Sequence, residues 1–426
     1  MDRARLRAEA LAVIRGNDRG DYSIPTAGLY PFQWNWDSAL TALGMATYDL
    51  PRAWREVETL AAAQRPDGMV PHIVFWQEDP GYFPSHAAWG TAGDPPASGI
   101  TQPPVLASVV LALAQRGGAE GRRRAAALAK PLLAWHRWFH TLREPAGDGL
   151  VALTHPWESG RDNSPDWDRP LAAVEVPADL PAYQRRDLDH VDADARPTRG
   201  QYDRFMALVA HGRACGWRQE EIVASAPFLV CDPGVQFILL RADRDLLEIL
   251  ALREGGGGAE AAEVEGWIER GEAACARLWS EEAGGYCARD LKRGELTAAA
   301  CSNASMLAWY AGIRDEEKMA RLAATAAALL DEAPCGMPSW DPRAAGYDAK
   351  RYWRGPAWAI MNHMIAQGMR EQGEEELARR LAQAQGRLYA AGFREYYEPR
   401  SGAGLGGGAF SWTAAVFLLW DSEELF

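Results

Sequence analysis

Apolar side chains recur at helical spacing through most of this 426-residue chain. Residues 51–64 begin with a proline at a first-turn position and then place Val57 and Leu60 on one face. Residues 356–370 and 411–420 repeat this pattern. Apolar residues three and four positions apart are typical of amphipathic helices. Similar stretches predict about twelve or thirteen helices and almost no strand, among them residues 200–215, 233–252, 259–279 and 301–312.

The connections between alternate helices share a glycine- and proline-rich character, as in residues 65–71, 282–287, 335–340 and 397–402. Helix pairs joined by such loops favour an all-α fold, a toroid of six helical hairpins known as the (α/α)6 barrel. Its inner helices would pack around an axis, and one end would open as a cleft lined by loops. We expect a single domain over residues 1–426.

Residues 143–200 depart from the helical pattern, because they are irregular and charged. A segment of that length without regular structure inside a compact domain is usually functional. We therefore predict a cap-like insertion, irregular and partly helical, that covers the cleft.

Composition excludes several classes of partner. The formal net charge of −13 argues against nucleic acid or an anionic membrane as the main partner. No 18-residue apolar run occurs, and the first helical stretch lacks the apolar region of a signal peptide. The six cysteines are scattered without a C-x-x-C pair, which favours reduced thiols over disulfides or zinc. We expect a cytoplasmic protein without metal or cofactor, and homo-oligomers stay possible.

The segment from Trp157 to Asp168 is the strongest indication of function. It places four carboxylates among two tryptophans, a glycine and a proline. An indole face binds the C–H side of a pyranose, and it raises the pKa of a neighbouring acid by desolvation. A second carboxylate can then act on the opposite face of the sugar. The alternative interpretation is a capped acidic surface loop.

Three further segments carry aromatic and charged residues in short loops. Residues 30–37 alternate aromatics with Gln33 and Asn35 and end in Asp37, which is either a sugar ligand or a helix N-cap. Residues 351–358 set two arginines beside two tryptophans, for structural stacking or for orienting hydroxyls and carboxylates. Residues 393–402 supply Glu395 and Glu398, candidates for the second carboxylate. Eighteen tryptophans in all, many in polar loops, favour an aromatic-lined pocket.

Other motifs give little support for a function. His136 and His140 are four apart but no glutamate follows His136, so a zinc-protease site is disfavoured and a core or surface pair is favoured. Gly402, Gly404 and Gly407 match G-x-G-x-x-G without a βαβ unit around them. The Asp-rich motif of terpenoid cyclases, which use a similar barrel, is missing from the sequence.

Together these motifs resemble glycoside hydrolase family 63 and, more loosely, the trehalases of family 37. The short bacterial mannosylglycerate and glucosylglycerate hydrolases match best in length and motif order. The resemblance covers nearly the whole chain, through W-E-S-G-x-D, Q-W-x-W-D, R-Y-W-R-G-P-x-W and E-Y-Y-E-P. It implies an inverting (α/α)6 enzyme that releases mannose or glucose from an α-glycoside of glycerate, a small molecule with an anionic aglycone.

The resemblance also implies roles for individual residues. Asp162 corresponds to the general acid and Glu395 to the general base, with Glu398 as the fallback. Arg196 and Tyr202 would meet the glycerate. The two carboxyls of an inverting pair lie roughly 6.5–9.5 Å apart. The sugar subsite would be lined by Tyr30, Trp34, Trp36, Asp37, Gln102, Trp157, Gly160, Tyr352, Trp353 and Trp358.

Two rival functions remain open on the sequence. One is an α-glucosidase or trehalase that acts on a neutral disaccharide, and the other is a sugar-binding protein without catalysis. Charge in the leaving-group subsite separates the first from a glycerate hydrolase: Arg196 directed into the pocket favours an acid, whereas an uncharged subsite favours a second sugar. The sugar-binding protein predicts that Asp162 and Glu395 are not on opposite walls, and that α-mannosylglycerate or α-glucosylglycerate releases no free sugar.

Overall fold

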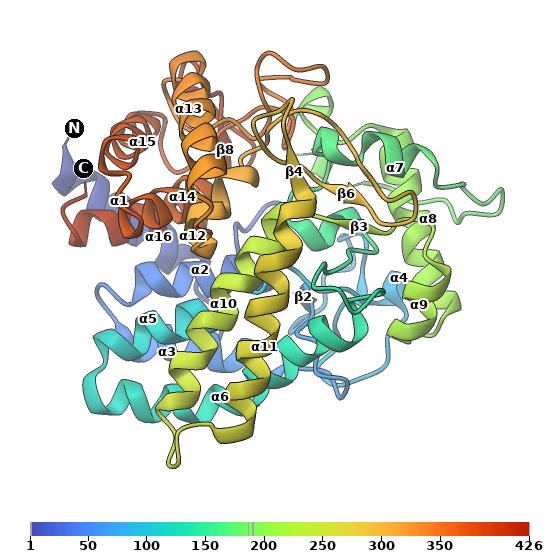
Figure 1. The fold of residues 1–426 in the computed structure, drawn as a ribbon, viewed down its shortest axis with the longest axis horizontal. Helices are drawn as coiled ribbons and strands as arrows, with labels where there is room; N and C mark the ends of the chain where they lie inside the picture. Colours follow the sequence, from blue (N-terminus) through green and yellow to red (C-terminus); the bar gives the residue numbers. More distant parts are fainter. Residues whose placement is uncertain (1, 186, 190, 426) are drawn as a thin grey trace.

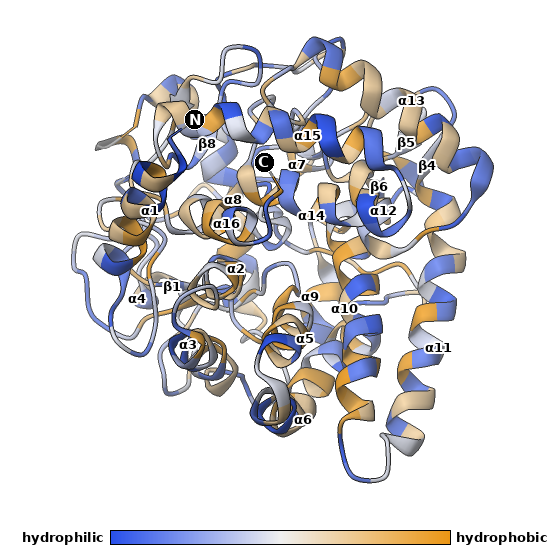
Figure 2. Cartoon of the chain, turned by 90° about the vertical axis from the view of Figure 1, so that its left-hand side faces the viewer, coloured by the Kyte–Doolittle hydropathy of each residue, from blue (hydrophilic) through white to orange (hydrophobic). Residues whose placement is uncertain are grey.

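The computed structural model describes residues 2–185, 187–189 and 191–425. Six helices form an inner ring, in which each contacts the next and the last, α16, contacts the first, α2. The end-on view in Figure 2 shows this ring surrounded by an outer one. The inner helices are α2 (Asn35–Met45), α5 (Leu106–Arg116), α10 (Pro233–Ala251), α12 (Ala308–Ala311), α14 (Ala359–Glu371) and α16 (Ser411–Ser422).

Outer helices alternate with inner ones along the chain, which is the order that six helical hairpins require. They are α1 (Arg3–Asn17), α3 (Leu50–Ala62), α6 (Gly118–Leu142), α11 (Gly258–Cys275), α13 (Glu316–Glu332) and α15 (Glu375–Leu388). The predicted (α/α)6 barrel is therefore confirmed. Figure 1 shows the blue N-terminal helices beside the red C-terminal ones, where the ring closes.

The amino-acid composition of the inner helices explains why they lie inside the ring. Helix α16 is buried along almost its whole length, from Ser411 to Trp420. A helix that is apolar on nearly every side must be covered on every side. The outer α3, by contrast, buries one stripe that includes Trp54, Val57 and Leu60.

The remaining elements lie outside the two rings, and all except α8 are short. Four more helices are α4 (His86–Trp89), α7 (Asp168–Ala172), α8 (Arg199–Ala214) and α9 (Gln219–Ser225). Two-residue strands pair antiparallel and tie loops together: β1 (Gln33–Trp34) with β2 (Ile73–Val74), β3 (Val230–Cys231) with β6 (Arg289–Asp290), β6 with β7 (Glu295–Leu296), β4 (Trp279–Ser280) with β5 (Gly285–Tyr286), and β8 (Tyr396–Tyr397) with β9 (Gly404–Leu405). The 3-10 turns are η1 (Pro156–Ser159), η2 (Pro165–Trp167), η3 (Asp187–Asp189), η4 (Ala193–Ala195), η5 (Ala276–Leu278), η6 (Ser305–Leu307) and η7 (Tyr389–Ala391).

Two helix predictions were too long. Residues 301–312 form η6 and the single turn α12, which ends at Gly312 with a φ of +82°. Helix α11 ends at Cys275, before η5 and β4, so the prediction of a helix to residue 279 was wrong by several residues.

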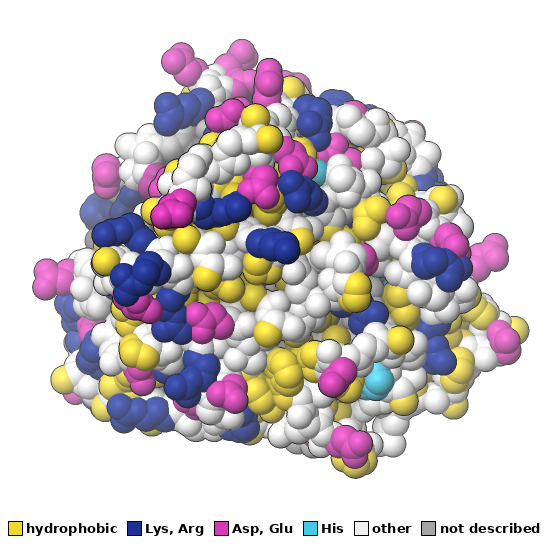
Figure 3. Space-filling model, turned by 90° about the horizontal axis from the view of Figure 1, so that it is seen from below, with side chains coloured by type: hydrophobic (Ala, Val, Ile, Leu, Met, Phe, Trp, Pro, Cys, Tyr) yellow, Lys and Arg dark blue, Asp and Glu magenta, His cyan; other side chains and the backbone are white. Residues whose placement is uncertain are grey.

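The surface charge is mixed rather than segregated. On the face in Figure 3, acidic and basic side chains lie interspersed around a hollow of hydrophobic atoms. This face therefore has no continuous basic surface of the kind that nucleic-acid binding requires. Among the described residues, no helix is long and apolar enough to cross a membrane. All six cysteines are free thiols.

Candidate active site

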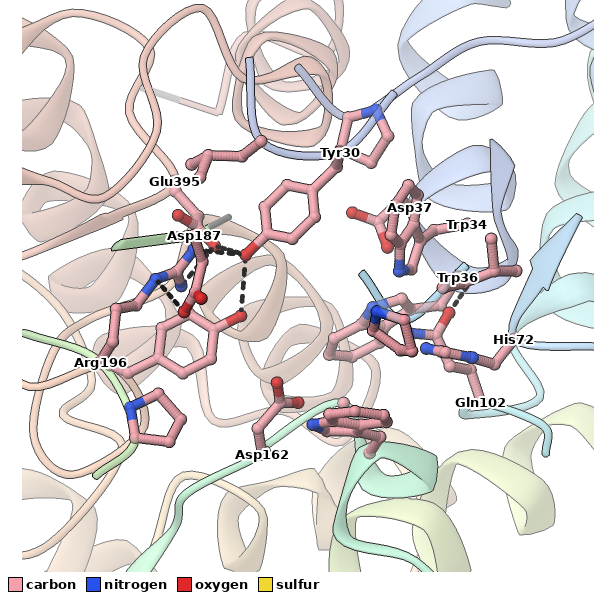
Figure 4. Close-up of a pocket in the computed structure, with 18 of the residues that line it drawn as sticks. Tyr30, Trp34, Trp36, Asp37, His72, Gln102, Asp162, Asp187, Arg196 and Glu395 are labelled. Atoms are coloured by element: carbon pink, nitrogen blue, oxygen red, sulfur yellow. Dashed lines mark hydrogen bonds and ion pairs between the residues drawn. The ribbon is translucent and has the colours of Figure 1, made fainter. Parts of the chain in front are cut away.

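A cavity opens on the barrel axis at the N-terminal ends of α2 and α16 (Figure 4). The wall combines residues of loops that lie far apart in the sequence. The residues that line the cavity are Pro25, Leu29, Tyr30, Trp34, Trp36, Asp37, His72, Ile73, Tyr82, Phe83, Pro84, Gln102, Trp157, Gly160, Asp162, Asp187, Arg196, Pro197, Tyr202, Tyr352, Glu395, Phe410 and Trp412. Of the fourteen predicted site residues, twelve are in this wall, all except Trp353 and Trp358.

Trp353 and Trp358 lie behind the wall. Their rings stack on each other at 3.7 Å with an interplanar angle of 4°, and both are buried. Trp353 packs near Trp36, and Trp358 contacts Trp412 edge-on. The prediction that the stacked pair lines the site is thus corrected: the pair packs behind indoles that line the cavity.

The fallback base Glu398 is also away from the cavity. Its carboxylate accepts hydrogen bonds from the backbone N–H groups of Arg400, at 3.1 Å, and Ser401, at 2.6 Å. These bonds cap the turn between β8 and β9 and lower the pKa of Glu398 despite burial, which acts in the opposite direction. Glu398 is therefore a turn-capping residue, and Glu395 is the carboxylate of this motif that reaches the site.

Asp162 projects into the cavity from the loop between η1 and η2. Burial raises the pKa of its carboxyl to about 7, with Arg196 opposing that shift and Glu395 adding to it. The loop is not an acidic surface loop, since residues 156–161 and 163–167 are buried. A desolvated carboxyl with a pKa near neutrality is suited to donate a proton.

The other carboxylates of this segment are structural. Glu158 receives two hydrogen bonds from Arg143, at 2.7 and 2.8 Å. Asp166 pairs with Arg161 at 3.0 Å. The fourth, Asp168, receives both of its bonds from Arg354, at 2.7 Å each. Only Asp162 of the four lines the cavity.

The guanidinium of Arg161 anchors the loop that carries Asp162. It contacts Asp166 and also Asp232, at 2.6 Å. Asp232 is the N-cap of α10, where its carboxylate accepts from the backbone N–H of Gly234. The residue beside the acid is thereby tied to an inner helix of the barrel.

Glu395 is held in one orientation by three partners. Its Oε1 accepts a hydrogen bond from the Tyr30 hydroxyl at 2.9 Å, and its Oε2 accepts one from the backbone N–H of Gly407 at 2.9 Å. The guanidinium of Arg196 lies 3.4 Å from Oε1. The side chain is 1% exposed. Figure 4 shows Glu395 and Asp162 on different sides of the open space.

Arg196 supplies the cavity with a positive charge. Its Nη2 donates to the Tyr30 hydroxyl at 2.7 Å, and its guanidinium lies 4.4 Å from the centre of the Tyr352 ring. The Nε of Arg351 donates to the Arg196 carbonyl at 3.3 Å, which holds the backbone. The two arginines of residues 351–358 thus serve structure, since Arg354 binds Asp168.

Asp187 was not predicted from the sequence, although it lines the cavity. Its carboxylate lies 3.7 Å from the Nε of Arg196. Arg185 donates to both of its oxygens, at 3.0 and 2.6 Å. Arg185 thus balances the charge of Asp187, while Arg196 also lies beside Glu395.

Asp37 and His72 lie on the α2 side of the cavity (Figure 4). The N-cap of α2 is Trp34, so the interpretation of Asp37 as an N-cap is wrong. Burial raises the pKa of Asp37 well above its ordinary value, and burial lowers the pKa of His72 well below its own. Burial thus disfavours the charged form of each of these two side chains. No local pattern singled out His72, which comes to the cavity through β2.

Gly160 allows the loop that carries Asp162 to approach the indole of Trp36. It has a φ of +67°, and a Cβ there would lie 2.5 Å from the Trp36 ring. A larger residue would displace the indole or the loop.

The histidine pair that was disfavoured as a zinc site is structural. His136 and His140 are buried and share Asp243, at 2.7 and 3.0 Å, which agrees with a core pair. Within the described residues, no group of three or more His, Cys, Asp or Glu could hold a metal ion.

Comparison with known proteins agrees with this geometry. The model of the mannosylglycerate hydrolase MGH1-like glycoside hydrolase domain matches residues 30–413. The mannosylglycerate hydrolase MGH2 of Selaginella moellendorffii is 44% identical, over 98% of this chain and 86% of its own. The glucosylglycerate hydrolase of Mycolicibacterium hassiacum is 36% identical, over 97% of each chain.

Solved structures give the same result. The family 63 mannosylglycerate hydrolase of Thermus thermophilus in complex with Tris has a TM-score of 0.93 and 43% identity, over 97% of this chain and 99% of its own. Its complex with Tris and D-glycerate has a TM-score of 0.91. Neutral trehalase of Saccharomyces cerevisiae, at 17% identity and a TM-score of 0.63, shares the fold. This chain therefore belongs to the MGH1-like glycoside hydrolases and is a glycoside hydrolase of the family 63 mannosylglycerate hydrolase type.

Proposed function

We propose that this enzyme hydrolyses α-mannosylglycerate or α-glucosylglycerate with inversion at the anomeric carbon. The observation that carries the proposal is Arg196, a buried guanidinium that is the one Lys or Arg among the described residues lining the cavity. A neutral disaccharide has no group that needs such a charge, whereas glycerate has a carboxylate. Relatives named for both substrates, and a related structure that contains D-glycerate, support this choice.

Asp162 is proposed as the general acid. With a pKa of about 7, a large share of its carboxyl groups is protonated at neutral pH. It donates that proton to the glycosidic oxygen while the bond between this oxygen and C1 breaks, so the electron pair stays on the departing glycerate. Trp157 lines the same cavity and excludes water from this side.

Glu395 is proposed as the general base. The hydrogen bonds from Tyr30 and Gly407 hold its carboxylate in one orientation at the cavity wall. A water molecule between Glu395 and the sugar transfers a proton to the carboxylate as its oxygen attacks C1. Attack opposite the leaving group yields the β-anomer of the free sugar.

We also propose that residues 143–200 act as an insertion that covers the cleft of a single domain. Asp187, Arg196 and Pro197 from its C-terminal part line the cavity. The segment would thus supply Arg196 to the leaving-group subsite, Trp157 and Gly160 to the sugar subsite, and the proposed acid Asp162 between them.

The test is a substrate panel. Purified enzyme is incubated with α-mannosylglycerate, α-glucosylglycerate, their methyl esters and trehalose, and the first anomer released is followed by proton NMR. We expect rapid release of the β-anomer from the free acids and much slower turnover of the esters. Faster turnover of esters or trehalose would support a neutral-disaccharide hydrolase. Binding without any release would support a sugar-binding protein, and initial α-anomer would exclude inversion.

A further inference from the structure

A second pocket lies at the other end of the barrel. It has a volume of about 460 Å³ and is lined by residues of the inner helices, chiefly α5 and α14. Along α2, Asp37 belongs to the catalytic cavity and Leu43 to this pocket. Along α16 the same division separates Trp412 from Leu419. Figure 2 looks onto this end, where α2, α5, α10, α14 and α16 surround the axis.

His363 of α14 presents a hydrogen-bond donor to this pocket. Its ring is 5% exposed, and its Nδ1 accepts the indole N–H of Trp420 at 2.9 Å. An indole nitrogen only donates, so the proton of the neutral imidazole must be on Nε2. Burial, together with the charges of Arg370 and Arg241, lowers the pKa of His363 to about 3, so the ring stays neutral. In the described part of the chain, Nε2 has no partner.

Arg370 lies on the same face of α14, seven residues further on. Side chains in a helix lean toward its N-terminus, which directs Arg370 toward His363. Within the described residues its guanidinium forms no hydrogen bond or ion pair. Burial lowers its pKa, although Glu423, Glu371 and Glu375 oppose that effect. A half-buried guanidinium without a partner destabilises the folded protein unless a ligand binds it.

The carboxylates of the pocket already have partners. Arg241 binds Asp245 at 2.9 Å and Glu371 at 2.6 Å. Glu423 binds Arg116 at 2.5 Å. Three arginines therefore face three carboxylates, so the formal charges cancel and the free donors decide what can bind.

We propose that this pocket binds a small organic carboxylate. One oxygen would accept from His363 Nε2 and the other from Arg370, while the aliphatic part would lie against Leu40, Val109 and Met364. A doubly charged anion is disfavoured, because only one unpaired cation is present among the described residues of the pocket. A neutral alcohol would leave the Arg370 charge unbound.

The test is calorimetric titration of the full-length enzyme with butyrate. Every protein carries Arg196→Gln, so that the catalytic cavity does not contribute a carboxylate site. We expect saturable binding to this parent, and a loss of affinity of about tenfold or more when Arg370→Gln is added. Arg379→Gln, on the exposed side of α15, is the matched control and should leave affinity unchanged.

Arg370 forms no bond within the described protein, so its variant should fold, and equal melting temperatures check this. A change in the NMR signal of the His363 Nε2 proton on adding butyrate is a second readout. The proposal is overturned if the parent shows no saturable binding, if Arg370→Gln binds as tightly as the parent, or if 1-butanol binds as well as butyrate.

Discussion

The guanidinium of Arg196 lies 3.4 Å from the carboxylate of Glu395 and also faces Asp162, whose pKa it lowers against the stronger effect of burial. One cation thus acts on both proposed catalytic carboxyls. It sits where the carboxylate of glycerate would bind. The charge of Arg196 therefore couples substrate recognition to the protonation of the acid.

Arg196→Gln should move the pH profile of kcat/KM. Without the guanidinium the pKa of Asp162 rises further, so the acid stays protonated to higher pH and the basic limb shifts upward. KM for α-mannosylglycerate should rise about tenfold or more, and KM for its methyl ester much less. Arg55→Gln on the outer helix α3 is the control. An unchanged basic limb would show that Arg196 does not influence the pKa of Asp162.

Asp162→Asn should lower kcat by about 10²–10⁴-fold while leaving substrate binding largely intact, since the amide cannot donate the required proton. A glycosyl fluoride, whose leaving group needs little protonation, should lose far less activity. Steady-state kinetics on both substrates check this. Near-native kcat on the glycerate substrate would end the assignment of Asp162 as the acid.

Glu395→Ala should abolish turnover of both the glycoside and the fluoride, because water loses its base in either case. Azide needs no base, so it should restore reaction and give a β-glycosyl azide. Glu398→Gln is the matched control: it loosens the turn between β8 and β9 but should keep kcat within about twofold. A larger loss in Glu398→Gln than in Glu395→Ala would reverse the assignment.

Asp162→Asn should also be the more stable protein above pH 7. The pKa of Asp162 is raised from 3.8 to about 7, so folding favours the protonated acid. Wild-type stability therefore falls as the pH rises through this window, whereas asparagine cannot ionise. The gain should reach the order of a few kcal/mol at pH 8 and vanish near pH 4. Thermal melts at both values test it, with the exposed Asp94→Asn as a control that shows no such difference.

Arg161→Met should destabilise the fold by about 3–5 kcal/mol, because Asp166 and Asp232 would be left as unpaired buried charges. Arg169→Gln, which breaks a half-exposed pair with Glu295, should cost less than about 1 kcal/mol. Denaturant unfolding of both variants makes the comparison. Equal losses would show that the anchor of the Asp162 loop contributes little.

The sequence was sufficient for the ring of helical hairpins, because amphipathic spacing and glycine-proline turns are local signals. It was less informative about which aromatics touch a ligand. Trp353 and Trp358 stand in the same kind of loop as Trp34 and Trp36, and only packing decides that the first pair supports the second.

Asp187 and His72 illustrate a second limit of predicting site residues from the sequence. Neither belongs to a motif, and each reaches the cavity through tertiary contacts that no local pattern encodes. The roles of Asp162 and Glu395 stay predictions that the kinetic variants test, although both carboxyls line one cavity.

Closure of the inner ring has a consequence for biosynthesis. Helix α16 completes the barrel against α2, and it brings Trp412 to the cavity just after the hairpin that carries Glu395. A nascent chain that has folded only its earlier barrel helices still lacks both Glu395 and Trp412. We therefore expect chains that end before residue 395 to be inert rather than weakly active.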